Sequence, residues 1–226
     1  MNRNQIMISL ILLIFVTSLF FFQSSSNRLS DASDLSNESI IDYANISEES
    51  STVTTYTHTF GLYINNANRD NTVSPNIVNR GESDPYVFTI EHNFVNGLTI
   101  KGSVNSVDTD LFTHNIPIQK WLYITVVVND TISELYIDGK LVNSSMQNGA
   151  FDTDYEKNIT IGDTSDWNAN DAFIASYDYY NYNLKPDAIL GLYQKFSNKY
   201  NTHTRDIYSI DIDFSKDDQS LANLSF

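Results

Sequence analysis

The sequence predicts an all-β fold, an antiparallel jelly-roll sandwich with one short C-terminal helix, preceded by an N-terminal transmembrane helix. Three observations support this prediction. Short runs of alternating apolar and polar residues recur about every 8–12 residues, which is typical of all-β domains. An uncharged apolar run lies near the start of the chain, and an apolar stripe at helical spacing follows the last clear strand of the central region.

The clearest strand pattern lies in the middle of the chain. Residues 121–128 alternate between two sets of β-branched and aromatic side chains, which predicts a strand with at least one buried face. Residues 134–138 alternate in the same way. Asp138 and Gly139 then predict a tight hairpin turn, because both central residues of such a turn need positive φ. With a third strand from residues 140–142, this region is an antiparallel meander, the usual unit of a sandwich.

Further strands are predicted on both sides of the meander. They cover residues 60–64, 76–81, 86–91, 98–104, 111–116, 159–162, 173–182 and 207–214. The last of these strands is expected to pair beside the first. Together they are enough for two packed sheets.

One helix is predicted from Pro186. Proline suits the first helical position, and Asp187 beside it favours the positive end of the helix dipole. Apolar and aromatic residues follow on one face at helical spacing. They are Ile189, Leu192, Tyr193, Phe196 and Tyr200.

These patterns also resemble a known family. Residues 121–128 and 135–142 resemble the centre of laminin-G-like domains of the concanavalin A-like lectin/glucanase superfamily. A second matching block is Ile161-Gly162 followed by residues 173–192, and the resemblance covers residues 53–200. The sequence of residues 115–121 is similar to the corresponding stretch in membrane-anchored members encoded by large DNA viruses. The resemblance implies the fold and leaves the function open, because this fold hosts lectins, adhesion modules and glycosidases.

Composition excludes some classes of partner. The chain has 226 residues and a formal net charge of −15 at pH 7. Such a charge repels nucleic-acid backbones and opposes docking on anionic lipid, so we expect no nucleic-acid partner. The chain has no cysteine, and a domain of about 170 residues can bury roughly 70% of its unfolded surface without disulfides.

The start of the chain predicts a membrane anchor. Residues 6–22 are uncharged and apolar, follow a short tail of residues 1–5, and have about the length that spans a bilayer. The run exceeds the usual signal-peptide core of about 7–15 residues, so a signal-anchor is preferred over a cleaved signal peptide. We expect a single-pass membrane protein with its C-terminal domain extracytoplasmic, lumenal or on a virion surface. A secreted protein is the alternative.

The other boundaries follow from composition. Residues 23–52 are rich in Ser, Asn, Asp and Glu and contain few residues that could be buried. They are predicted to be a disordered acidic spacer. The sandwich is expected to cover residues 53–215, and residues 216–226 are expected to form a loose tail.

A glycoside hydrolase is the weak alternative to a binding domain. Retaining glycosidases need two carboxyl groups about 5–5.5 Å apart. In the laminarinase-like branch of the superfamily these groups come from an ExDxxE pattern. Residues 82–84 begin such a pattern, but Val87 stands at the last acidic position and Pro85 is unsuited to a central strand. We therefore expect no enzyme and no catalytic residue.

One polar loop is a candidate calcium site. Asp166, Asn168 and Asn170 are spaced two residues apart, as are the first ligands of a calcium loop. An EF-hand is excluded, because Asp171 replaces the required Gly and Tyr177 replaces the last Glu. A looser calcium site and a solvated turn are the two interpretations. The candidate ligands are Asp163, Asp166, Asn168, Asn170 and Asp171.

Aromatic residues are the candidate sugar contacts. Exposed aromatic rings can stack on sugars while polar groups bind the hydroxyls. The alternative for a tyrosine in a strand is half-buried packing. Tyr123 and Tyr136 are expected opposite the apolar faces of neighbouring strands, and Tyr177 and Tyr179 on one face of a later strand. Trp167, in the polar loop, is the fifth candidate.

Several Asn-X-Ser/Thr sequons occur, and they matter only if the protein follows a secretory route. Those within the predicted sandwich are Asn129, Asn143 and Asn158. The sequence thus predicts a non-enzymatic, membrane-anchored recognition domain with a glycan as the first ligand and calcium as the one candidate cofactor. The alternative is a structural or assembly protein of a membrane surface that binds other proteins.

Overall fold

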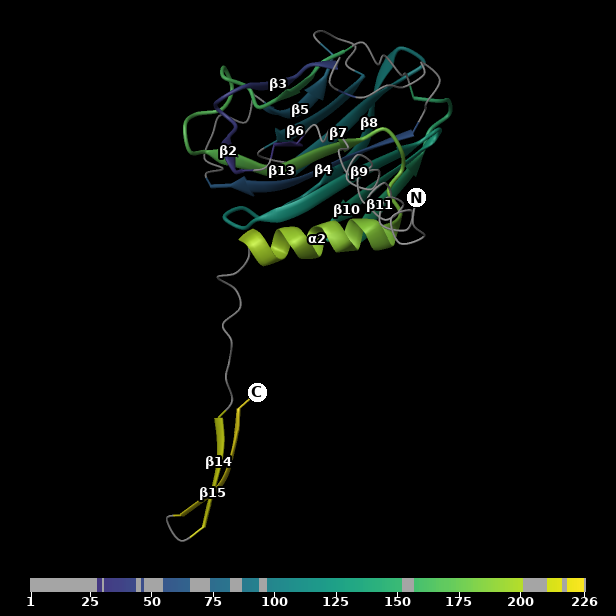
Figure 1. Cartoon of the computed structure of the whole chain (residues 1–226). Helices are drawn as coiled ribbons and strands as arrows, with labels where there is room; N and C mark the ends of the chain where they lie inside the picture. Colours follow the sequence, from purple (N-terminus) through teal and green to yellow (C-terminus); the bar gives the residue numbers. More distant parts are fainter. Residues whose placement is uncertain are drawn as a thin grey trace, which may run out of the picture.

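The computed structural model describes residues 28–29, 31–43, 46, 55–65, 74–81, 87–93, 97–151, 157–200, 211–216 and 219–225. Two antiparallel sheets pack face to face, and one helix lies against the outside of one of them (Figure 1). This arrangement confirms the predicted all-β sandwich with one short C-terminal helix.

The first sheet has seven strands, which we call the helix-covered sheet. Its order is β1 (Arg28–Leu29), β13 (Ala172–Tyr180), β4 (Thr55–Ile64), β9 (Leu122–Asn129), β10 (Ile132–Ile137) and β11 (Lys140–Met146), and β2 (Ser33–Asp34) also pairs with β13. The Asp138-Gly139 turn joins β10 to β11, with φ of 51° and 74°, as predicted for a tight hairpin.

The second sheet has six strands, which we call the open sheet. Its order is β3 (Ser39–Ile41), β12 (Ile159–Ile161), β5 (Asn76–Arg80), β6 (Phe88–Asn93), β7 (Gly97–Val104) and β8 (Val107–His114). The two sheets end at β8 and β11 on the same side of the sandwich, where these strands contact each other. The core lies between the sheets and includes Phe60, Leu62 and Ile64, which alternate inward along β4.

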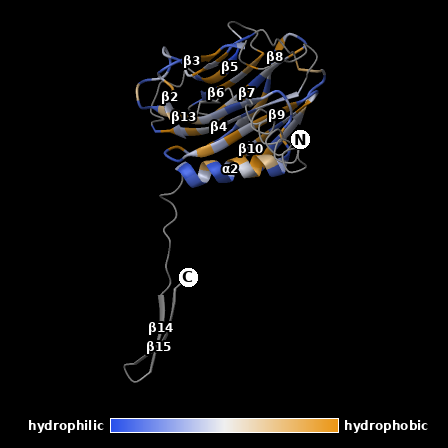
Figure 2. Cartoon of the chain, in the orientation of Figure 1, coloured by the Kyte–Doolittle hydropathy of each residue, from blue (hydrophilic) through white to orange (hydrophobic). Residues whose placement is uncertain are grey.

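Helix α2 (Pro186–Tyr200) covers the outer face of the helix-covered sheet (Figure 1). Its buried residues Ile189 and Phe196 contact side chains that point outward from β9, β10 and β13. Figure 2 shows hydrophobic residues along β9 and β10 and on α2. As a result residues 122–128 of β9 are buried on both faces of the strand.

Part of the predicted acidic spacer is folded, so the expected start of the sandwich at residue 53 is wrong. Strands β2 and β3 pair with the two sheets, and Leu35 between them is 0% exposed in the core. The backbone N–H of Leu35 donates to Ala172, and its carbonyl accepts from Asp163 N. Only a few apolar residues, Leu35 with the partly buried Ile41 and Ile46, attach this segment to the core. So few residues leave almost no trace in composition, which explains the error.

The C-terminal prediction is also corrected. Strand β14 (Asp211–Lys216) pairs with β15 (Gln219–Ser225) in a separate two-stranded sheet, and it does not pair beside the first strand of the sandwich. Residues predicted as a loose tail therefore supply a strand. The predicted anchor at residues 6–22 lies outside the described residues, and within the described part no helix is long and apolar enough to cross a membrane.

Candidate functional site

Two of the predicted sugar contacts, Tyr123 and Tyr136, lie beneath α2. They are 2% and 3% exposed. The Tyr123 ring packs 5.0 Å from the ring of Phe196, and Tyr136 belongs to a cluster with Ile189 of the helix. These rings point outward from the sheet as predicted, but the helix occupies the face on which a sugar would stack.

The Tyr136 hydroxyl is also engaged. It donates a hydrogen bond of 2.8 Å to Glu134 Oε2. Burial, followed by this hydrogen bond and the charge of Glu134, raises the pKa of Tyr136 to about 12. The residue is therefore a neutral packing residue at physiological pH.

Tyr177 and Tyr179 share one face of β13, but that face points between the sheets. Tyr177 is fully buried, and its hydroxyl lies 2.8 Å from His58 Nδ1. The Tyr179 hydroxyl accepts a 2.8 Å bond from Arg80, whose guanidinium carbon also lies 5.1 Å from the Tyr179 ring centre. Both tyrosines serve a buried polar cluster, so the interpretation of Tyr177 as a ligand contact is wrong in this structure.

His58 lies at the centre of this polar cluster. Its ring stacks on Phe88 at 4.4 Å, and it is 0% exposed. Burial, and to a smaller extent the charge of Arg80, holds the pKa of His58 well below its ordinary 6.5. Burial likewise raises the pKa of the Tyr177 hydroxyl well above 10. The cluster is thus a network of neutral rings around one buried guanidinium, which the sequence pattern did not reveal.

Trp167 closes the end of the sandwich and does not project from its loop. The side chain is 3% exposed and its Nε1 donates a 2.7 Å bond to the carbonyl of Asn76. Its ring lies 6.3 Å from His92, whose pKa burial lowers to about 4. The predicted sugar contact is therefore a buried structural residue.

Two carboxylate oxygens of the candidate calcium loop, from Asp163 and Asp166, accept hydrogen bonds from Ser165 of the same loop. Asp163 Oδ1 accepts from both the backbone N–H and the hydroxyl of Ser165, at 2.9 and 2.7 Å. The N–H of Asn170 donates to Asp34 Oδ2 at 2.6 Å, and Asp171 is 7% exposed. No group of three or more His, Cys, Asp or Glu that could hold a metal is found among the described residues. Calcium binding through Asp163, Asp166, Asn168, Asn170 and Asp171 stays a prediction.

The three sequons of the sandwich differ in accessibility. Asn129 and Asn143 are exposed at the end of β9 and in the middle of β11. Asn158 is half-buried, and its Oδ1 accepts a 3.0 Å bond from the backbone N–H of Tyr43. Asn129 and Asn143 are therefore the sites that a glycan could occupy without disturbing a hydrogen bond to a distant residue.

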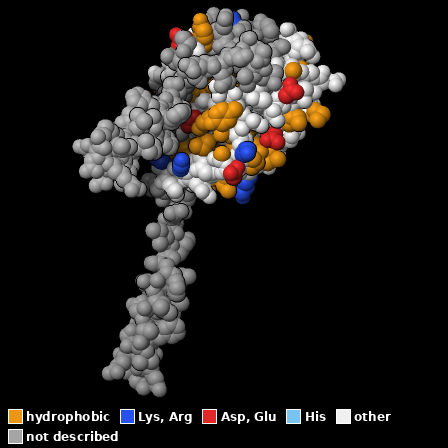
Figure 3. All heavy atoms as spheres, turned by 45° about the vertical axis from the view of Figure 1, so that its right-hand side comes forward, with side chains coloured by type: hydrophobic (Ala, Val, Ile, Leu, Met, Phe, Trp, Pro, Cys, Tyr) orange, Lys and Arg blue, Asp and Glu red, His pale blue; other side chains and the backbone are white. Residues whose placement is uncertain are grey.

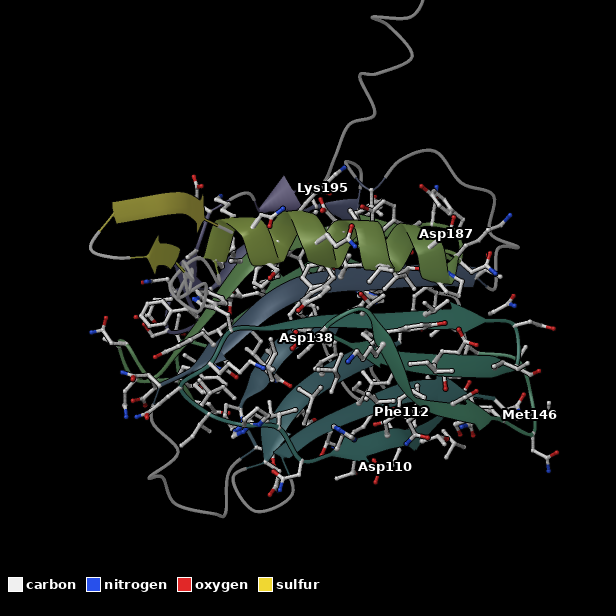
Figure 4. All side chains as sticks on the ribbon, turned by 90° about the horizontal axis from the view of Figure 1, so that it is seen from below. Asp110, Phe112, Asp138, Met146, Asp187 and Lys195 are labelled. Atoms are coloured by element: carbon white, nitrogen blue, oxygen red, sulfur yellow. The ribbon has the colours of Figure 1, made fainter. Side chains whose placement is uncertain are left out.

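A small, shallow hollow, open to solvent, lies between α2 and β13. Its apolar lining comes from the buried rings under the helix, and its polar lining comes from two lysines, a serine and an aspartate. The lining residues are Tyr123, Ser176, Asp178, Leu192, Lys195, Phe196 and Lys199. Figure 4 shows Lys195 on α2, toward the end of the helix opposite Asp187. No sequence pattern pointed to this site, because it depends on where the helix docks.

A second exposed feature is the edge formed by β11. Leu141, Val142 and Met146 are 53%, 40% and 76% exposed, although they are apolar. Leu190 of α2 is also exposed, at 43%. Figure 3 shows hydrophobic side chains gathered on one face of the sandwich among charged ones. An edge strand with unpaired backbone groups and apolar side chains is suited to contact with another protein.

Comparison with known proteins identifies the family. Residues 39–190 match the family described as the concanavalin A-like lectin/glucanases superfamily. The match begins before residue 53, in agreement with the folded position of β3. No curated protein matches the chain.

Solved structures share the fold. The receptor binding domain of botulinum neurotoxin C/D mosaic serotype superposes with a TM-score of 0.63 at 16% identity, covering 73% of this chain and 42% of that one. The serotype D ligand binding domain in complex with N-acetylneuraminic acid gives 0.61 at 16% identity, covering 75% and 44%. The binding domain of neurotoxin DC in complex with rat synaptotagmin II gives 0.55 at 16% identity, covering 70% and 40%. The chain spans less than half the length of these proteins.

Proposed function

The chain belongs to the concanavalin A-like lectin/glucanase superfamily, and on that premise we propose that it is a non-enzymatic recognition domain whose first ligand class is carbohydrate. The observation that carries this proposal is the hollow between α2 and β13. It combines an apolar base with amine, hydroxyl and carboxylate groups at its rim. Sugar sites use the same combination, because the apolar base excludes water and the polar rim binds hydroxyl groups.

The structural neighbours support a binding role. One was solved in complex with N-acetylneuraminic acid and another in complex with rat synaptotagmin II. Because identity is 16% and coverage of those proteins is below one half, the neighbours support the general class of function and give no residue of this chain a role.

We further propose that residues 6–22 anchor the chain in a membrane as a single-pass segment. The support is the uncharged apolar composition of this run. The sandwich then lies in an extracytoplasmic or lumenal space or on a virion surface, where a recognition domain meets its ligand. Cleavage of the segment and secretion is the alternative.

A glycan array tests the carbohydrate proposal. The full-length chain is applied in detergent micelles, with calcium and again with a chelator. Binding in both conditions supports a lectin that does not depend on calcium. Binding only with calcium adds support for the loop at residues 163–171. A blank array from a demonstrably folded sample removes the carbohydrate proposal.

A blank array would favour the second candidate, a structural or assembly protein of a membrane surface. The exposed apolar residues of β11 support this alternative, because a soluble edge strand is usually protected by charge. Cross-linking of the membrane-bound chain, compared between the wild type and Val142→Lys, tests it. Loss of a cross-linked partner in the variant would support a protein interface at this edge.

A further inference from the structure

The hollow between α2 and β13 lies beside an irregularity in the strand. The register of β13 against β4 shifts between Ala175 and Asp178, and Ser176 within the shift has a φ of 51°. Positive φ is costly for a residue other than glycine, and such bulges redirect side chains next to functional sites. Here the bulge places Ser176 and Asp178 on one side of the hollow, opposite the helix.

The helix side of the hollow is basic. Lys195 and Lys199 are four residues apart on α2, so they lie one turn apart on the same face. The lining therefore contains two cations and one anion, Asp178, whereas the whole chain carries a net charge of −15. The exposed carboxylate of Asp31 also lies 3.4 Å from Lys199, so the lining has a cationic surplus only when Asp31 is displaced, and it then favours an anionic group at this position.

The two lysines differ in their contacts. Lys195 has no ion pair within the part of the chain that the structure describes. Lys199 Nζ lies 3.4 Å from Asp31 Oδ1, and the Asp31 side chain is 89% exposed. An exposed pair of this kind is weak, because water and salt screen it, so an incoming anion can replace Asp31 at small cost.

We propose that this hollow binds the carboxylate of an acidic sugar, with Lys195 and Lys199 as its cationic partners and Asp31 as a carboxylate that competes for Lys199 in the free protein. The sugar ring lies against the half-buried Leu192 and the narrow exposed edges of the Tyr123 and Phe196 rings, and Ser176 is in position to bind a hydroxyl. This inference rests on the proposed carbohydrate function and names its ligand class.

A matched pair of sugars tests the inference. Methyl β-glucuronide and methyl β-glucoside share a ring and differ in one group, a carboxylate against a hydroxymethyl. Their binding to the full-length chain in micelles is measured by saturation-transfer NMR up to about 10 mM, the range of single-sugar affinities. We expect the glucuronide to bind at least about tenfold more tightly than the glucoside. Equal binding of the two sugars, or no binding of the glucuronide, would overturn the inference.

Two double variants locate the site. In K195Q/K199Q we expect the dissociation constant of the glucuronide to rise at least about tenfold. The control K140Q/K185Q removes two exposed lysines elsewhere and should leave it within about twofold. Thermal unfolding of both variants checks their folding. Equal loss in the two variants would show that total charge, and not this hollow, holds the sugar.

Two more arms complete the test. Inorganic phosphate at the same concentration should displace the glucuronide poorly. Displacement at equal affinity would show that the site binds any anion, which would overturn the sugar assignment.

Asp31→Asn should tighten glucuronide binding about two- to fivefold, while Glu38→Gln in the same segment should not. If neutral glycans bind on the array and the glucuronide does not bind, the proposed function stands and this inference fails. If both experiments are blank, both fail.

Discussion

The outer faces of the two sheets differ in how deeply their residues are buried. The open sheet carries half-buried polar residues such as Glu91, Thr99 and Lys101 on its outer face. The helix-covered sheet instead buries Tyr123, Val127 and Ala175 under α2. Residues 98–102 of β7 in the open sheet therefore alternate in burial, whereas β9 in the helix-covered sheet does not. The difference teaches that aromatic residues on an outer face are ligand candidates only after the position of the helix is known.

The largest test of this comparison removes the main contact of the helix. Phe196 is 3% exposed and packs on Tyr123 and Ala175. We expect Phe196→Ala to lower the free energy of unfolding by about 3–5 kcal/mol, because it deletes a buried ring and leaves a cavity. Denaturant unfolding measures the loss. A loss below about 1 kcal/mol would mean that the helix adds little to the stability of the sheet.

Acid should affect both sheets, since each holds a buried histidine. His58 lies on β4 and His92 on β6, and burial lowers the pKa of both, that of His92 to about 4. Below pH 6.5 the unfolded chain binds protons that the folded chain does not, so the free energy of unfolding falls as pH falls. For His92 this loss is spread between pH 6.5 and about 4 and amounts to roughly 3 kcal/mol at its lower end.

Unfolding curves at pH 7, 6, 5 and 4 measure this dependence. In His92→Gln the free energy of unfolding should fall less between pH 6.5 and 4 than in the wild type, because one of the two buried histidines that take up a proton on unfolding is gone. An identical decline in the variant would show that His92 is not buried in its neutral form. Stability that rises as the pH falls would contradict the assignment for both histidines.

The close approach of the helix depends on a small residue in β4. A Cβ atom at Gly61 would collide with the ring of Phe196, whereas a Cβ at Gly191, inside the helix, would meet nothing within 4 Å. We expect Gly61→Ala to lower the free energy of unfolding by about 1–3 kcal/mol through overpacking. The matched control Gly191→Ala should raise it by about 0.5–1 kcal/mol, because alanine is the better helix former. Equal effects from the two substitutions would contradict the close packing of the helix against Gly61.

Much of the fold was predictable from local pattern. The strands of the meander and the helix that begins at Pro186 follow from periodicity, and the hairpin at Asp138 follows from turn chemistry. The resemblance to the superfamily, stated from residues 121–128 and 135–142, agrees with the family match. These features depend on neighbouring residues, so one sequence is enough to find them.

The candidate site was less predictable, because it depends on contacts between distant residues. The alternation of β9 correctly placed Tyr123 on the outer face, but only the docked helix shows that this face is covered. One signal was available: Val127 is apolar and on the same face, which favours a second buried surface. The hollow with Lys195 and Ser176 joins a helix to a bulge in a strand, and neither the bulge nor the docking leaves a periodic signal.

The smallest expected effect lies on the open sheet. Lys101 Nζ lies 2.9 Å from Glu91 Oε2, and the two side chains are 34% and 14% exposed. Because solvent reaches this pair, we expect a double-mutant cycle of Lys101→Met and Glu91→Gln to give a coupling of about 1 kcal/mol or less at low salt. The coupling should decrease further at about 1 M salt, where screening is strong. A coupling above about 2 kcal/mol that does not change with salt would mean that solvent is excluded from this outer face as it is from the face under α2. The two outer faces would then be alike.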